Sequence, residues 1–143
     1  MRAIVRNAVL AGLALALLRA DAQSDVNDLL GSMTAALVEV NAQEFMGAFD
    51  KNMPDYERLK GNVEALVNQA DVSSSIEPLK NEGDDSRRMV DLDWFLEVRS
   101  LLQDGPIVRR REVIHCELQK QGKRWKIVSL TPIDFFAPAN LAR

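Results

Sequence analysis

The two side chains with the most versatile chemistry, His115 and Cys116, are neighbours, and each is the only residue of its type in the chain. They lie in a run typical of a β-strand, where adjacent side chains point to opposite faces, so the two cannot bind the same metal ion. No Gly-x-Ser-x-Gly motif supplies a nucleophile for His115, and no glycine-rich loop is present to hold a phosphate. We therefore expect no metal site and no cofactor, with Cys116 acting as a small buried apolar residue.

Carboxylates offer a second kind of chemistry, because a buried aspartate near a tyrosine hydroxyl can transfer protons. Asp91 and Asp93 lie in the most regular strand pattern of the sequence, and Tyr56 is the only tyrosine. Strict alternation, however, places both aspartates on the face opposite to Leu92 and Trp94. We expect the two aspartates to pair with arginines at the surface, and an acid–base enzyme is the alternative.

Three consecutive arginines supply candidates for those pairs. Arg109 and Arg111 share a strand face, and we expect them to form cross-strand ion pairs with the acidic residues of the preceding strand, Asp91, Asp93 and Glu97. Arg110 and Glu112 share the other face with apolar side chains, where a charge is costly unless it is paired. These two residues are either an internal salt bridge at the mouth of a cavity or a polar hook for a ligand.

The same alternation gives the candidates for a ligand pocket. Residues of the inward strand face could border a cavity, and Tyr56 lies beside the break that Pro54 introduces. The large aromatic side chains could form a ligand cage, or they could simply fill the core. The pocket candidates are Tyr56, Trp94, Arg110, Glu112 and Cys116, and no residue is assigned a catalytic role.

Helical patterns fill the first half of the chain. Apolar residues at helical spacing predict a helix from Val26 to Val40. Asn41 and Glu44 have the spacing of a capping box, which predicts a second helix from Asn41. Asp55 is expected to cap a third helix that extends to Ala70.

The second half of the chain has the period of β-strands. Strands are predicted over residues 72–79, 89–101, 107–120 and 124–131, with turns at 81–85, 104–106 and 121–123. The last two strands form a hairpin around Gly122. Helices first and a meander of antiparallel strands afterwards predict an α+β domain.

The N-terminus has the features of an export signal. Arg2 and Arg6 precede an apolar run, and Ala20-Asp21-Ala22 offers small residues at a cleavage site, so we expect removal of residues 1–22. The apolar run from Val9 to Leu18 is shorter than the roughly 20 residues of a membrane-spanning helix, so no stable membrane anchor is expected. The predicted location is periplasmic or extracellular, with residues 23–143 as a single domain.

Net charge bears on which partners the chain can bind, and cysteine content bears on how it is stabilised. The full chain has a net charge of −3. The predicted leader carries more basic than acidic residues, so the mature chain is more acidic still. An acidic domain is not expected to bind nucleic acid. With one cysteine, the chain cannot form an internal disulfide, so its stability must come from the core.

Several motifs of the second half together resemble a known superfamily. They are Asp93-Trp94, Arg109-Arg110-Arg111, Trp125-Lys126-Ile127 and Phe135-Phe136-Ala137-Pro138. Across roughly residues 25–138 the chain resembles the nuclear transport factor 2-like superfamily, which includes ketosteroid isomerases and SnoaL-like polyketide cyclases, and it looks most like an uncharacterised exported bacterial branch. The resemblance implies N-terminal helices packed in the concave face of a curved antiparallel sheet, a cone-shaped, cystatin-like roll.

The resemblance also suggests one expected function and two alternatives. We expect a non-catalytic domain that binds a small apolar or amphipathic ligand, or a protein partner, in or around the cone. One alternative is an isomerase-like or cyclase-like enzyme with a buried carboxylate, although no residue matches the isomerase motif. The other is a structural homodimerisation module with a filled cone. A homodimer through the outer sheet face is expected because Phe95 and Val113 are apolar there and relatives commonly pair through it.

Overall fold

The computed structural model describes residues 21–141. A helix over residues 21–38 comes first, followed by α2 (Ala42–Met46) and α3 (Tyr56–Gln69). The strands are β1 (Ala70–Gly83), β2 (Arg87–Ser100), β3 (Ile107–Gln121) and β4 (Arg124–Thr131), and a short 3-10 helix, η1 (Ile133–Phe136), follows. Most of the predicted export signal lies outside the described residues. No helix of the described part is long and apolar enough to cross a membrane.

The helices form where the apolar spacing predicts them. The helix over residues 21–38 buries Val26, Leu30, Met33 and Leu37 on one face. Asn41 caps α2 as predicted, because its side chain accepts a hydrogen bond from the Glu44 N–H at 3.0 Å and donates one to the Glu44 carboxylate at 3.1 Å.

The start of α3 corrects one prediction. Asp55 occupies the N-cap position, but its side chain makes no capping hydrogen bond. Its backbone is left-handed, with φ of 63°, and does not have the extended conformation from which a cap side chain normally reaches the first turn. The Asp55 carboxylate instead lies 3.9 Å from Arg58.

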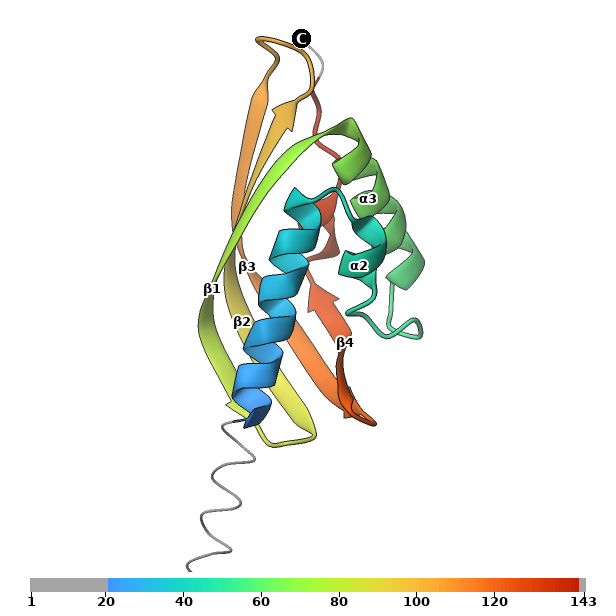
Figure 1. The fold of residues 1–143 in the computed structure, drawn as a ribbon, viewed down its shortest axis with the longest axis vertical. Coiled ribbons are helices and arrows are strands. Elements are labelled where there is room, and N and C mark those ends of the chain that lie inside the picture. The colour runs from blue at the N-terminus through green and yellow to red at the C-terminus, as the bar shows by residue number, and fades with distance from the viewer. Residues whose placement is uncertain (1–20, 142–143) are drawn as a thin grey trace, which may run out of the picture.

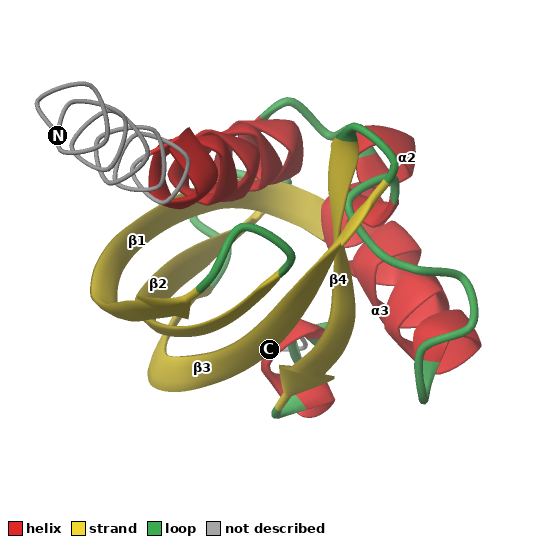
Figure 2. Cartoon of the chain, turned by 90° about the horizontal axis from the view of Figure 1, so that it is seen from below, coloured by secondary structure: helices red, strands yellow, loops and turns green. Residues whose placement is uncertain are grey.

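The four strands form one antiparallel sheet in the order β1-β2-β3-β4. The sheet curves around the helices, which lie against its concave face (Figures 1 and 2). β1 is longer than predicted, because it pairs with β2 along almost its whole length and so includes part of the expected turn. At the shortened turn, Asp84 accepts hydrogen bonds at 2.8 Å from the backbone N–H groups of Ser86 and Arg87.

The alternation predicted for the longest apolar stripe is confirmed in β2. Its inward side chains, Val90, Leu92, Trp94, Leu96 and Val98, are fully or almost fully buried. Arg88 extends this inward face and is also buried. Its charged group has partners there, because the guanidinium donates to the Asn81 side chain at 2.9 Å and to the Asn81 carbonyl at 2.8 Å.

Aromatic rings fill the space between the helices and the sheet. Phe45 contacts both Trp94 and Phe136, with ring centroids 6.4 and 5.5 Å apart. The indole N–H of Trp94 donates to the Ser74 hydroxyl at 2.8 Å, so its polar atom is satisfied inside the core. The interior of the cone is therefore packed with side chains.

Candidate functional site

The residues predicted to line a pocket are distributed between the core, β3 and α3. Trp94 and Cys116 are part of the hydrophobic core. Burial raises the pKa of the Cys116 thiol to about 12, so the sulfur stays protonated at neutral pH. Trp94, Arg110, Glu112 and Cys116 do not line the Tyr56 pocket, the hairpin groove or three further surface hollows of residues 21–141.

Arg110 and Glu112 do not form the internal salt bridge. No ion pair joins them in residues 21–141, and Glu112 is exposed, so the internal salt bridge is absent. Arg110 instead donates to the carbonyls of Phe135, at 2.9 Å, and Ala137, at 2.5 Å. Partial burial lowers the pKa of its guanidinium, and the two carbonyls accept charge-assisted hydrogen bonds from it. Arg110 thus holds the C-terminal segment against the sheet.

The outer sheet face carries the cross-strand charge pairs that the sequence predicts. Arg111 binds Asp93 at 2.6 Å and Arg109 binds Glu97 at 3.1 Å. Hydrogen bonds from these arginines, and from Arg99 to Glu97, lower the pKa of both carboxyl groups. Asp91 completes the row, with its carboxylate 2.7 Å from His115 Nδ1. Because Asp91 and Asp93 face outward, neither supplies a carboxylate to the interior.

Tyr56 does border a pocket, at the rim of the cone. This Tyr56 pocket has a volume of about 570 Å³ and lies between α2, α3 and β4. Its apolar lining includes Ala42, Met46 and Phe49, and three lysines, Lys51, Lys60 and Lys126, surround it together with Glu64. The Lys126 ammonium donates to the Gly47 carbonyl. The spacing of these lysines along the chain gave no sign of the pocket, because they come from separate elements.

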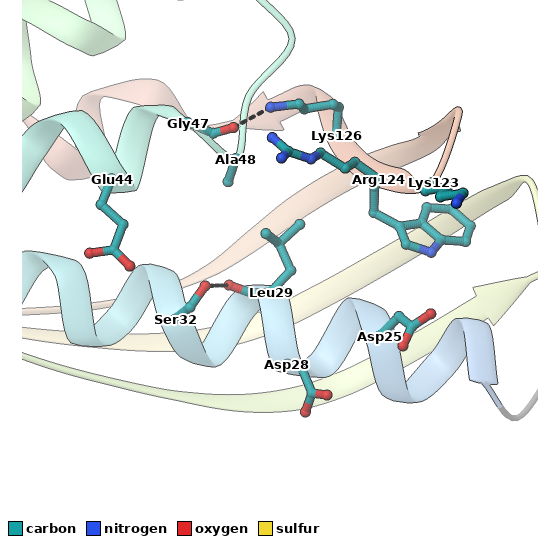
Figure 3. Close-up of a pocket in the computed structure, with 11 residues that line it drawn as sticks. Asp25, Asp28, Leu29, Ser32, Glu44, Gly47, Ala48, Lys123, Arg124 and Lys126 are labelled. Atoms are coloured by element: carbon teal, nitrogen blue, oxygen red, sulfur yellow. Dashed lines mark hydrogen bonds between the residues drawn. The ribbon is translucent and has the colours of Figure 1, made fainter.

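A second hollow, the hairpin groove, has a volume of about 550 Å³. The residues that line it come from the helix over residues 21–38, the segment 44–48 and the hairpin residues 123–126 (Figure 3). Its apolar lining consists of Leu29, Ala48 and Trp125. Periodicity alone shows that Trp125 faces inward, but it does not show which helix lies opposite.

Comparison with known proteins identifies the fold. No family model and no curated protein matches the sequence. Among solved structures, a scytalone dehydratase-like protein of Novosphingobium aromaticivorans superposes with a TM-score of 0.67 at 11% identity, covering 75% of this chain and 79% of that one. An NTF-2-like protein of unknown function from Shewanella oneidensis gives 0.57 at 11% identity, over 75% and 94% of the two chains.

A protein of unknown function with a cystatin-like fold from Nostoc punctiforme is also similar, with a TM-score of 0.59 at 9% identity over 74% of this chain and 85% of that one. The described domain therefore has the nuclear transport factor 2-like, cystatin-like α+β fold, as the sequence resemblance implied. At these identities the similarity extends to the fold and not to an activity.

Proposed function

We propose that this protein is a non-catalytic binding domain that takes a small anionic amphipathic ligand in the Tyr56 pocket. The observation that carries the proposal is the combination of a packed interior with a pocket of about 570 Å³ at the rim. That volume lies within the roughly 300–1,000 Å³ of typical small-molecule sites. The ligand would thus bind around the cone and not inside it.

The lining of the Tyr56 pocket supports an anionic amphiphile. Ala42, Met46 and Phe49 form its apolar floor, in which Met46 and Phe49 are almost fully buried, and the three lysines outnumber the single carboxylate of Glu64. An ammonium on a long flexible side chain can follow an acid group while its methylenes cover an apolar body. The Tyr56 hydroxyl can donate or accept one further hydrogen bond.

The alternative of an acid–base enzyme has weaker support. Such chemistry on this fold needs a carboxylate in an enclosed apolar cavity. Asp91 and Asp93 pair with His115 and Arg111 on the outer face. The acidic residue of the Tyr56 pocket, Glu64, is exposed on α3.

A thermal-shift screen with fatty acids, steroid acids and polyketide-like acids tests the proposal. We expect at least one acid to stabilise the wild type, and Lys60→Glu to weaken its binding by about tenfold or more, the equivalent of roughly 1.4 kcal/mol. Lys120→Glu is the matched control, since Lys120 is an exposed lysine of β3 outside the pocket. Absence of any stabilisation of the wild type, or equal loss in both variants, would contradict the proposal.

Homodimerisation through the outer sheet face is a second candidate function. Met89 and Val113 are 51% and 42% exposed on that face, and Phe95 is half-buried on the same face. In a symmetric dimer the same face of a second copy would cover these apolar side chains, and the charged residues of each copy would lie opposite those of the other. Light scattering at high micromolar concentration should show a dimer that Val113→Lys dissociates; a monomeric wild type contradicts it.

Export remains part of the proposal as well. It rests on the apolar run and the Ala20-Asp21-Ala22 site. Mass spectrometry of the protein recovered from a cell envelope should find an N-terminus at Gln23. An intact Met1 on membrane-bound material would contradict the prediction.

A further inference from the structure

β4 is an edge strand whose outer side is only partly covered. It pairs with β3 on one side. On the other side, the Ile127 N–H donates to the Ala48 carbonyl and the Asp50 N–H donates to the Ile127 carbonyl, both at 2.8 Å. These bonds form a single parallel bridge between Phe49 and Ile127.

The backbone of Trp125 points to the same open side. Trp125 pairs with Lys120 and Ile127 pairs with Leu118, two residues apart along both strands, so the two residues have the same orientation toward β3. In a strand, the N–H and C=O groups of residues two apart point the same way. Within residues 21–141, no hydrogen bond reaches the Trp125 backbone from that side. Trp125 thus offers one free donor and one free acceptor at a strand edge.

The hairpin groove lies beside this free edge. The segment that pairs with Ile127 does not continue along β4, because the residues before Ala48 turn away into α2. The hollow of about 550 Å³ is lined by Gly47 and Ala48, where the segment leaves β4, and by hairpin residues 123–126. Figure 3 shows Leu29 of the N-terminal helix and Ala48 on either side of this space.

The two walls of the groove carry charges of opposite sign, and no ion pair connects them in the described residues. Asp25 and Asp28 border it on the helix, and Lys123 and Arg124 border it on the hairpin. All four are exposed, and no salt bridge in the described part of the chain includes any of them. The acidic and basic side chains are therefore unpaired in the described residues, and a guest between them can meet both.

We propose that the hairpin groove binds an extended peptide, which adds to the edge of β4 by hydrogen bonding to the Trp125 backbone. Successive side chains of such a peptide point to opposite sides. Basic side chains on one side would reach Asp25 and Asp28, and acidic side chains on the other would reach Lys123 and Arg124. The preferred sequence alternates basic and acidic residues, with their methylene groups lying over Leu29 and Trp125.

Titration of the full chain with a short blocked peptide of alternating lysine and glutamate tests this inference. We expect saturable binding, slower hydrogen exchange of the Trp125 amide, and a loss of about tenfold or more when alternate peptide amides are N-methylated, or roughly 1.4 kcal/mol. N-methylation leaves every charge in place and removes only backbone donors. Equal binding of the methylated peptide, or unchanged exchange at Trp125, would overturn the proposal.

Charge order is tested separately. A peptide of the same composition with its lysines and glutamates in two blocks should bind more weakly than the alternating peptide. The double variant Asp25→Lys/Asp28→Lys should lose about tenfold or more in affinity, and Glu39→Lys, an exposed change just after the same helix, should not. No binding of the alternating peptide at millimolar concentration, or equal binding of the two peptides, would also overturn it.

Discussion

Trp94 packs edge-on against Phe136, with their ring centroids 5.0 Å apart and their planes at 85°. Trp94 comes from the middle of β2, whereas Phe136 ends the short helix η1 beyond the sheet. Both side chains are fully buried. Their contact fills part of the interior of the cone, and neither ring lines the Tyr56 pocket or the hairpin groove.

Truncation of Trp94 should be strongly destabilising. Trp94→Ala removes a fully buried indole and leaves the Ser74 hydroxyl without its donor, so we expect a loss of about 3 to 5 kcal/mol in the free energy of unfolding. Chemical denaturation measures the loss. Phe95→Ala, on the half-buried outer face of the same strand, should cost clearly less. A loss below about 1 kcal/mol for Trp94→Ala would show that the indole is not part of the core.

Arg110 and Arg109 should differ in their effect on stability, although they are neighbours. Arg110→Met leaves the Phe135 and Ala137 carbonyls without their charged donor, and we expect a loss of about 1.5 to 3 kcal/mol. Arg109→Met breaks a surface pair with Glu97 and should cost less than about 1 kcal/mol. Equal losses in the two variants would mean that Arg110 does not anchor the C-terminal segment.

Asp84 should contribute to the stability of the fold against acid. The backbone N–H groups of Ser86 and Arg87 lower its pKa to about 2, from an ordinary value of 3.8. A lowered pKa in the folded state means that this stabilisation is complete above pH 3.8 and is lost as the pH falls through about 2. Asp84→Asn should therefore flatten the fall of the denaturation midpoint over that interval; parallel curves for the two proteins would contradict the prediction.

Cys116 should be inert in the folded protein. Its pKa of about 12 and its burial leave almost no thiolate at pH 8 and no path for a reagent. We expect iodoacetamide to modify Cys116 only after unfolding, as mass spectrometry of native and denatured samples would show. Rapid alkylation of the native protein would indicate that the β3 core opens easily.

Local patterns in the sequence determined much of the fold. The period of two in β2 placed Trp94 inside and Asp93 outside, because pleating alone sets which face each residue takes. The reciprocal hydrogen bonds of Asn41 and Glu44 followed from a spacing of three residues. Such features depend on neighbours along the chain, so they can be derived without knowledge of the packing.

Contacts between distant segments decided what the domain offers for function. Whether the cone is open or filled depended on the approach of Phe136 to Trp94, and the partners of Arg110 came from a segment beyond the last strand. The free edge at Trp125 exists because the chain before Ala48 turns away from β4. No periodic signal records these relationships, because each results from how whole elements pack together, and this is why the sequence determined the fold while only the tertiary structure located its pockets.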